Sequence, residues 1–417
     1  MRISRALLAL LPTMLLLAVA ELLVRWTGAS ERCPGYENNL LLACDPVFFF
    51  RANPSQVIHG KPLNRHGFRT HEFTPKKPGT LRVLALGDSS TFGVISPGPA
   101  RSLVWLREPY PEKLERLAAE RNASPEVEVL NAGVPGYNSF QGLLLLRTRL
   151  RGLAPDLVTV RFGWNDHLMS PAGRLPGAFR EPEATWRRTL QDLLYRTALY
   201  GFALRLGMEV RYLFAELPAP SLPARWEPDV PLPLFRRNLR RIVEVGRKEG
   251  AQVWLLTSPH AFLTSEHRDR PEHFPPSSAA GFLLEANALS SYEELVRIHE
   301  RYNEAIRKVA LETASRLVDL EEVYRRHAEE HLFEEGDCVH PNDAGHELEA
   351  RVLYEELLRT GLLRESPTRV GADSARRDAK PHRPPGRRDA EAAKLAESHG
   401  APYARAPNGS QEEEKGW

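Results

Sequence analysis

Apolar runs with strand character recur along this chain, and helix-like stretches separate them. Continuous apolar strands that alternate with helices are typical of a parallel sheet covered on both faces. The pattern therefore predicts a three-layer α/β domain over residues 81–362, with a parallel sheet of five strands. The expected strands are residues 83–87, 127–131, 157–162, 253–257 and 317–320.

Two insertions interrupt this alternation. Residues 171–233 are expected to form a pair of helices followed by a proline-rich return, and residues 260–289 a long loop with a short helix. Each insertion follows the carboxyl end of an expected strand, and ligands bind at this edge in such sheets. The insertions are therefore candidates for a lid or for a wall of the substrate site.

The N-terminus carries an apolar run over residues 6–24, preceded by Arg2 and Arg5. One interpretation is an uncleaved membrane anchor, because the run approaches the roughly 20 residues of a spanning helix and the arginines favour a cytoplasmic N-terminus. The other is a cleaved signal peptide, because residues 18–20 read Ala-Val-Ala. Residues 22–24 extend the run beyond this site and favour the anchor. Residues 1–26 are thus a signal anchor or signal peptide, and either places the rest of the chain outside the cytoplasm.

The segments that flank the domain differ in composition. Residues 27–80 combine aromatic residues with turn signals, and Phe48, Phe49 and Phe50 need burial. We expect this N-terminal extension to pack on the domain as short strands. Residues 363–417 are charged, contain prolines and have few large aliphatic residues, which predicts a disordered tail.

Composition narrows the possible functions. A chain of 417 residues, 42% of them hydrophobic, has enough apolar surface for a substantial core, which excludes disorder throughout. Its 56 basic and 54 acidic residues give a net charge of +2, so no basic excess indicates a nucleic-acid partner. In an oxidising compartment Cys33 and Cys44 can close a small loop and leave Cys338 unpaired, but the sequence does not fix the pairing.

Candidate chemistry appears where the first and last expected strands give way to loops. The first strand ends in Gly87-Asp88-Ser89-Ser90 before a possible helix, a turn that places a hydroxyl near the positive N-terminal end of that helix. A nucleophilic serine needs a base, and the base needs an orienting carboxylate. Asp337 precedes His340 by three residues on a loop that leads into a helix. These two side chains are candidates to face Ser89.

Two further strand ends offer amide donors. The second ends in "NAGVPGYNSFQG", where Gly136 has a backbone N–H in a turn, and the third ends in "RFGWNDH", where Asn165 has a side-chain amide. Preorganised amide donors stabilise a tetrahedral oxyanion, each by about 3 kcal/mol. The sequence thus contains a candidate nucleophile, base, acid and oxyanion donors.

These blocks resemble those of the SGNH hydrolases, also called the GDSL lipase/esterase family, in content and order. The family's GDS, glycine, GxND and DxxH blocks read here as Gly87-Asp88-Ser89, Gly136, Gly163-Trp164-Asn165-Asp166 and Asp337-Cys338-Val339-His340. The resemblance covers residues 81–362 and implies a flavodoxin-like SGNH fold with a three-layer α/β/α arrangement. The N-terminal anchor, "NRHGFR" at residues 64–69 and the helical insertion are similar to a membrane-anchored bacterial branch of the family.

The resemblance also implies a role for each site residue. Ser89 is the expected nucleophile, His340 the general base and acid, and Asp337 the group that orients His340. The backbone N–H groups of Ser89 and Gly136 and the side chain of Asn165 are the expected oxyanion hole. Gly133 is the alternative to Gly136, since the choice between them depends on spacing alone.

Other polar residues near these blocks have simpler interpretations. Asp88 is expected to cap the following turn, because a sequence neighbour of Ser89 cannot easily reach behind its histidine. Asp166 is expected to brace the loop of Asn165. The spacing of Asp337, His340, Asp343 and His346 offers metal ligands, but it spreads them across a proline-started helix and leaves the Ser, Asn and Gly blocks unexplained. The sequence thus predicts neither a metal nor a cofactor.

The leading hypothesis is a serine esterase that cleaves a carboxylic ester, an O-acetyl ester among the candidates, through an acyl-enzyme on Ser89. The expected substrate is a small-molecule or glycan ester, and the N-terminal helix makes the membrane a further partner. Three alternatives stay open: a carbohydrate O-acyltransferase that uses the same residues, an inactive envelope binding protein, and a metal-dependent hydrolase. The catalytic domain is expected outside the cytoplasm, membrane-anchored or secreted.

Overall fold

The computed structural model describes residues 5–29, 42–45, 47–98, 103–171, 185–215, 226–268, 270–287 and 289–365. They belong to a unit that ends at Ser366. The tail expected over residues 363–417 lies outside the described residues from position 366 onward.

A parallel sheet of five strands forms the centre of the domain, as the apolar runs predicted. Its order is β14-β13-β10-β5-β9, and every neighbouring pair is parallel. All eight residues of β5 are buried, because helices cover both faces of the sheet. The strands are β5 (Thr80–Gly87), β9 (Glu126–Gly133), β10 (Leu157–Arg161), β13 (Gln252–Leu256) and β14 (Arg316–Val318).

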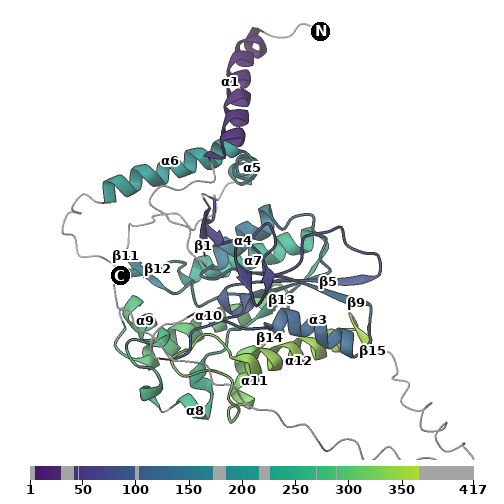
Figure 1. The fold of residues 1–417 in the computed structure, drawn as a ribbon, viewed down its shortest axis with the longest axis vertical. Helices are drawn as coiled ribbons and strands as arrows, with labels where there is room; N and C mark the ends of the chain where they lie inside the picture. Colours follow the sequence, from purple (N-terminus) through teal and green to yellow (C-terminus); the bar gives the residue numbers. More distant parts are fainter. Residues whose placement is uncertain are drawn as a thin grey trace, which may run out of the picture. The chain divides into compact units, whose positions relative to one another are not determined.

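The alternation of side chains along the strands separates two cores. Leu84, Leu86 and Val160 belong to the core that includes residues of α4 (Ser139–Thr148), α7 (Leu232–Lys248) and α10 (Tyr292–Glu312). Val83, Ala85 and Leu256 belong to the core that includes residues of α3 (Tyr110–Glu120) and α12 (Asp343–Arg359). Because successive side chains of a strand point to opposite faces, these two cores are the two faces of the sheet. The predicted three-layer arrangement is therefore confirmed (Figure 1).

The N-terminal extension contributes two short strand pairs beside the sheet. They are β1 (Leu42–Asp45) with β2 (Phe49–Ala52), and β3 (Val57–Ile58) with β4 (Lys61–Pro62). Phe48 is buried in the core of α4, and the hydroxyl of Tyr137 donates to the Phe50 carbonyl at 2.8 Å. These contacts fasten the extension to the turn that precedes α4.

The insertions and the edges of the domain carry the remaining elements. The first insertion contains α5 (Thr185–Leu194) and α6 (Ala198–Ala215), and β11 (Met169–Pro171) pairs with β12 (Trp226–Pro228) at its base. The second contains η2 (Ala261–Leu263), α8 (Ser265–Arg268), η3 (Pro271–His273) and α9 (Ala279–Ala286). Elsewhere lie α2 (Ser89–Phe92), α11 (Leu320–Arg326) and two pairs, β6 (Val94–Ile95) with β7 (Val104–Trp105) and β8 (Ala123–Ser124) with β15 (Arg364–Glu365).

Residues 363–365 pack against the domain. Leu363 is 1% exposed and lies in the core of α12, while Arg364 and Glu365 pair with Ser124 and Ala123. Leu363 therefore packs in the core one residue past the expected boundary at residue 362, and Arg364 and Glu365 form a strand pair with β8.

The N-terminal helix α1 (Arg5–Thr27) is joined to the first insertion. Glu21 accepts hydrogen bonds from the backbone N–H groups of Ala198 and Leu199 at 2.9 and 2.7 Å, at the start of α6. A carboxylate at this place is favoured by the unpaired N–H groups of the helix end. Within the described part of the chain, no helix has the length and apolar character to cross a membrane, so the expected anchor is not confirmed.

Candidate active site

A tight turn positions Ser89 at the carboxyl edge of the sheet. β5 ends at Gly87, the side chain of Asp88 accepts a hydrogen bond from the Ser90 N–H at 3.0 Å, and α2 begins at Ser89. A Cβ atom at Gly87 would collide with the Thr91 side chain, so glycine lets the helix fold back on the strand end. Asp88 is thus the N-cap of α2, which confirms the expected capping role.

The structure brings Ser89, His340 and Asp337 into one hydrogen-bonded chain. Ser89 Oγ lies 2.8 Å from His340 Nε2, and His340 Nδ1 lies 2.8 Å from Asp337 Oδ2. The Asp337 side chain is fully buried, while that of His340 is 13% exposed. With Nδ1–H donating to the carboxylate, Nε2 is left to accept the proton of the serine hydroxyl.

Backbone donors fix the orientation of Asp337. Its Oδ1 accepts from the N–H groups of Val339 and His340, each at 3.0 Å, and its Oδ2 accepts from the Ser96 N–H at 2.6 Å. Ser96 follows β6, so one contact comes from the loop after this strand. The carboxylate is therefore held between the loop that follows β6 and the loop that carries His340.

Burial and charge act in opposite directions on His340. Burial disfavours the imidazolium, but the charge of Asp337 and its hydrogen bond outweigh burial, and the pKa of His340 is raised above its ordinary value. Asp88 contributes in the same direction and Arg161 opposes it. A raised pKa makes His340 a stronger proton acceptor, which suits a general base.

The predicted oxyanion donors lie in neighbouring loops. Gly136 has φ +81°, a conformation that favours glycine, in the turn before α4. The Asn165 side-chain amide donates to the carbonyl of Tyr137 at 2.9 Å, so the loop after β10 meets the turn of Gly136. Gly133 is constrained by close packing, since a Cβ atom there would lie 2.5 Å from the backbone nitrogen of Phe92 in α2. The oxyanion role of Gly136 and Asn165 stays a prediction.

Asp166 braces the loop of Asn165, as the sequence suggested. Its carboxyl group accepts from the backbone N–H of Ser139 at 3.0 and 3.1 Å and from the Ser139 hydroxyl at 2.5 Å. Burial raises the pKa of Asp166 to about 7, against the effect of these hydrogen bonds. The contact ties the loop after β10 to the first turn of α4.

Sequence reasoning missed a buried ion pair next to the strand end that precedes Ser89. Arg161, the last residue of β10, is the register partner of Gly87 and donates two hydrogen bonds of 2.9 Å to Glu349 of α12. Both side chains are 0% exposed, and the Tyr324 hydroxyl donates to the same carboxylate at 3.0 Å. An arginine at a strand end was the available signal, but its partner lies 188 residues away.

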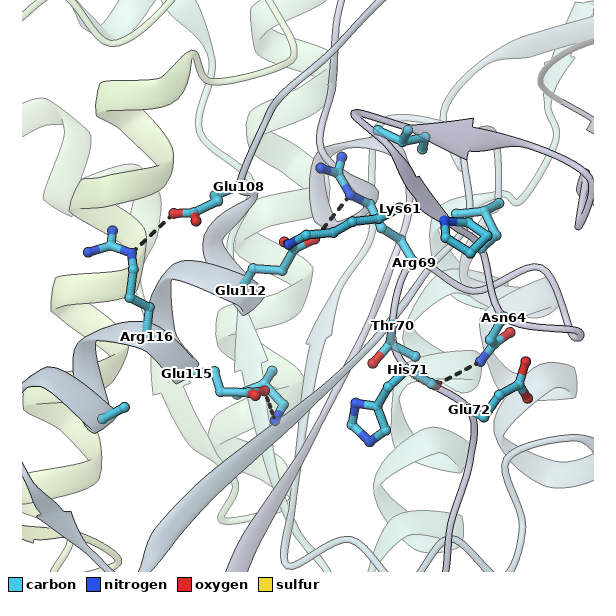
Figure 2. A pocket seen from close by; sticks show the side chains of 15 residues that line it. Lys61, Asn64, Arg69, Thr70, His71, Glu72, Glu108, Glu112, Glu115 and Arg116 are labelled. Atoms are coloured by element: carbon cyan, nitrogen blue, oxygen red, sulfur yellow. Dashed lines mark hydrogen bonds and ion pairs between the residues drawn. The ribbon is translucent and has the colours of Figure 1, made fainter.

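The extension supplies a second residue that sequence reasoning missed. Arg69 is 7% exposed and donates to the carbonyls of Phe92 and Gly93, where α2 ends, and through Nε to Glu112 of α3. It lines a cavity of about 650 Å³ between the extension and α3 (Figure 2). None of Ser89, Asp337 and His340 lines this cavity, so it is separate from the candidate active site.

The alternative metal interpretation does not fit the positions of its residues. His346 is buried and accepts from the Tyr110 N–H through Nδ1 at 2.9 Å, while the exposed Asp343 pairs with Lys113 at 3.0 Å. These two side chains therefore do not converge with Asp337 and His340 on a common point.

Cys338 is a free, buried thiol, so it does not tie the N-terminal segment to the active site. Burial raises the pKa of Cys338 well above its ordinary value, which makes the thiol unreactive. Cys33 and the side chain of Cys44 lie outside the described residues.

The fold and the site together define a three-layer α/β protein with a Ser–His–Asp arrangement at the carboxyl edge of its sheet. Residues 85–348 match the GDSL-like Lipase/Acylhydrolase family, which is more than half of the chain, and the protein belongs to that family. It is therefore an ester-cleaving hydrolase. No curated protein matches its sequence.

Solved structures with a similar fold include a lipase/acylhydrolase from Enterococcus faecalis, at 18% identity and a TM-score of 0.40, covering 69% of this chain and 99% of that one. The acetylxylan esterase Axe2 from Geobacillus stearothermophilus is 19% identical with a TM-score of 0.38, covering 68% and 96%. The acetyl xylan esterase AlAXEase is 14% identical with a TM-score of 0.38, covering 66% and 99%.

Proposed function

We propose that this hydrolase cleaves carboxylic esters through an acyl-enzyme on Ser89. The observation that carries the proposal is the continuous chain from Ser89 Oγ to His340 Nε2 at 2.8 Å and from His340 Nδ1 to Asp337 at 2.8 Å. This is the connectivity of nucleophile, base and orienting acid that acyl transfer requires.

The reaction starts with attack of Ser89 Oγ on the ester carbonyl carbon while its proton moves to His340 Nε2. The carbonyl oxygen becomes an oxyanion, and the N–H groups of Ser89 and Gly136 and the Asn165 amide are its proposed donors. As the C–O bond breaks, His340 returns the proton to the leaving alcohol. Water then attacks the acyl-enzyme with His340 again as base, which releases the acid and regenerates Ser89.

The proposed substrate is a small-molecule or glycan ester. The transferase alternative shares every step up to the acyl-enzyme and differs only in the acceptor, which is a carbohydrate hydroxyl in place of water. Product analysis separates the two: release of free carboxylic acid in proportion to alcohol supports hydrolysis, and transfer of the acyl group to an added sugar supports the alternative.

We also propose that the enzyme acts outside the cytoplasm and that residues 1–26 direct it there. Two arginines before a long apolar run support this, as do the exposed apolar side chains of Leu15, Leu16 and Leu22 on α1. Cell fractionation of the full chain and of a variant without residues 1–26 tests the proposal. Retention of both proteins in the cytoplasmic fraction would contradict it.

Labelling with a fluorophosphonate tests the nucleophile directly, since this probe reacts with activated serines. The full chain is expected to carry one adduct at Ser89, and Ser89→Ala is expected to abolish it. The matched control is Ser90→Ala, because Ser90 is the next residue, is 1% exposed and makes no side-chain hydrogen bond. A folded protein whose Ser89 resists labelling would favour the binding-protein alternative.

A further inference from the structure

A group of histidine and glutamate side chains lies beside the catalytic loop but outside the Ser–His–Asp chain. Glu266 and His267 belong to the short helix α8 of the second insertion, and His331 belongs to the segment that follows α11. One ligand atom from each of these side chains lies within 4.8 Å of the other two. Glu266 Oε2 is 2.7 Å from His331 Nδ1 and 3.9 Å from His267 Nε2.

We propose that Glu266, His267 and His331 form a binding site for a divalent transition-metal cation of the zinc type. Two imidazole nitrogens and one carboxylate oxygen are a donor set that Zn²⁺ accepts, with a fourth position left for water. Ligands at about 2.0–2.1 Å from a tetrahedral zinc ion lie roughly 3.4 Å from one another. The separations of 2.7 and 3.9 Å lie on either side of this value.

Small side-chain movements are enough to complete the geometry. The side chains of Glu266 and His331 are 35% and 53% exposed, so both can rotate, whereas that of His267 is fully buried and acts as a fixed ligand. His267 Nε2 now faces the Phe333 carbonyl at 3.3 Å, a long contact that metal binding replaces. The carbonyl oxygen then lies beside the cation, where a partial negative charge is favourable.

The second nitrogen of each imidazole already faces a polar partner. His267 Nδ1 lies 3.0 Å from His273 Nδ1, and His331 Nε2 lies 3.6 Å from Glu334. Outer partners of this kind orient ligating histidines and fix their tautomers. Glu335 adds a third carboxylate, 3.6 Å from His273. Among the described residues, Glu266, Glu334 and Glu335 form ion pairs with histidines only. With the histidines neutral, the three carboxylates give this site a negative charge that attracts a cation.

The site joins two segments that support the catalytic loop. The carbonyl of His331 accepts from the Asn342 side chain at 3.2 Å, and Phe333 forms a β-bridge with Pro341, the neighbour of His340. The second insertion also contacts this loop, because the Ala261 N–H donates a hydrogen bond to the Cys338 carbonyl at 3.1 Å. A cation between α8 and His331 thus cross-links two segments that contact the loop of Asp337 and His340.

Metal titration of the untagged full chain, stripped with a chelator, tests this site without any assay of hydrolysis. We expect one equivalent of Zn²⁺ to bind in calorimetry and to raise the Tm. One equivalent of Co²⁺ is expected to give the intense visible absorption of a four-coordinate site. Loss of an outer partner of a ligand alone weakens metal binding about 10- to 100-fold, so His331→Gln and Glu266→Gln, which each remove a proposed ligand, are expected to weaken Zn²⁺ binding by at least about tenfold. Both side chains are partly exposed, so these variants keep the fold, which circular dichroism checks.

The matched control is His327→Gln, which removes an exposed histidine that pairs with Glu330 at 2.7 Å on the segment just before His331. This variant is expected to bind Zn²⁺ as the unchanged protein does. The proposal is overturned by an absence of saturable binding at one equivalent, by unchanged affinity in both His331→Gln and Glu266→Gln, or by an equal loss in His327→Gln.

Discussion

Ser89 Oγ and His340 Nε2 lie 2.8 Å apart, although 251 residues separate them in the sequence. The contact exists because β5 ends at Gly87 and because backbone N–H groups hold Asp337 behind the imidazole. Because of this contact, the protonation state of His340 is expected to control the reactivity of Ser89. The pH dependence of the reaction and the removal of Asp337 both test this relationship.

The kcat/KM for ester hydrolysis is expected to fall on the acid side with a midpoint above 6.5. Only neutral His340 accepts the serine proton, so activity is present above its pKa and lost as pH falls through it. Burial lowers the pKa of His340, but the charge of Asp337 and its hydrogen bond together raise it by more. The pKa of His340 is therefore higher than the ordinary value of 6.5. A pH–rate profile measures the midpoint. A midpoint below 6.5 would contradict the dominance of Asp337.

Asp337→Asn is expected to lower kcat about 10⁴-fold, the scale on which loss of the orienting carboxylate acts in serine hydrolases. The amide cannot accept the Nδ1–H bond in the same way and supplies no charge to stabilise the imidazolium. The acid limb of the pH–rate profile is also expected to move to lower pH. Retention of the raised midpoint in Asp337→Asn would assign the shift to another group.

Asn165→Ala is expected to reduce kcat by about 10²–10³-fold with little change in KM, because an oxyanion donor acts only in the transition state. The matched control is Asp166→Asn, next to it in the same loop, which is expected to act mainly on stability through its contacts to Ser139. Steady-state kinetics with a chromogenic acetate ester measures both variants. A pure KM effect in Asn165→Ala would refute the oxyanion assignment.

The sheet could be predicted from the sequence because its strands are buried on both faces, as the fully buried β5 shows. The convergence of Ser89, Asp337 and His340 could be predicted because their blocks lie at strand ends in a recognisable order. The ion pair of Arg161 could not be predicted, because a charged residue in an apolar strand does not indicate that its partner is Glu349 of α12. The burial of Leu363, one residue past the expected boundary at residue 362, could not be predicted, because a single apolar residue has no periodicity to reveal it.

Arg161→Met is expected to destabilise the protein by about 3–5 kcal/mol, because it leaves the buried Glu349 carboxylate without its cation. The double variant Arg161→Met/Glu349→Leu is expected to recover most of this loss, since it removes both charges of the buried pair, although the Tyr324 hydroxyl then loses its partner. Urea unfolding measures both changes in free energy. A double variant no more stable than the single one would show that the pair itself contributes net stability.

Arg69→Ala tests whether the extension holds α2, the helix that begins at Ser89, in place. Arg69 donates to Glu112, to the Phe92 and Gly93 carbonyls at the end of α2, and to the carbonyls of Leu106 and Arg107. Loss of these hydrogen bonds leaves backbone carbonyl groups without their donor and is expected to lower the free energy of unfolding by about 1–3 kcal/mol. It is also expected to lower kcat, because α2 loses the contacts that fix its end.

Arg65→Ala is the matched control for Arg69→Ala, because Arg65 lies in the same "NRHGFR" stretch but its side chain is 73% exposed beside Glu72. An exposed pair of this kind contributes at most about 1 kcal/mol, so the control is expected to change stability and kcat little. Urea unfolding and steady-state kinetics measure both variants. If Arg69→Ala loses stability but keeps kcat, the extension stabilises the domain without positioning Ser89, whereas loss of both supports a direct role of the extension in holding α2.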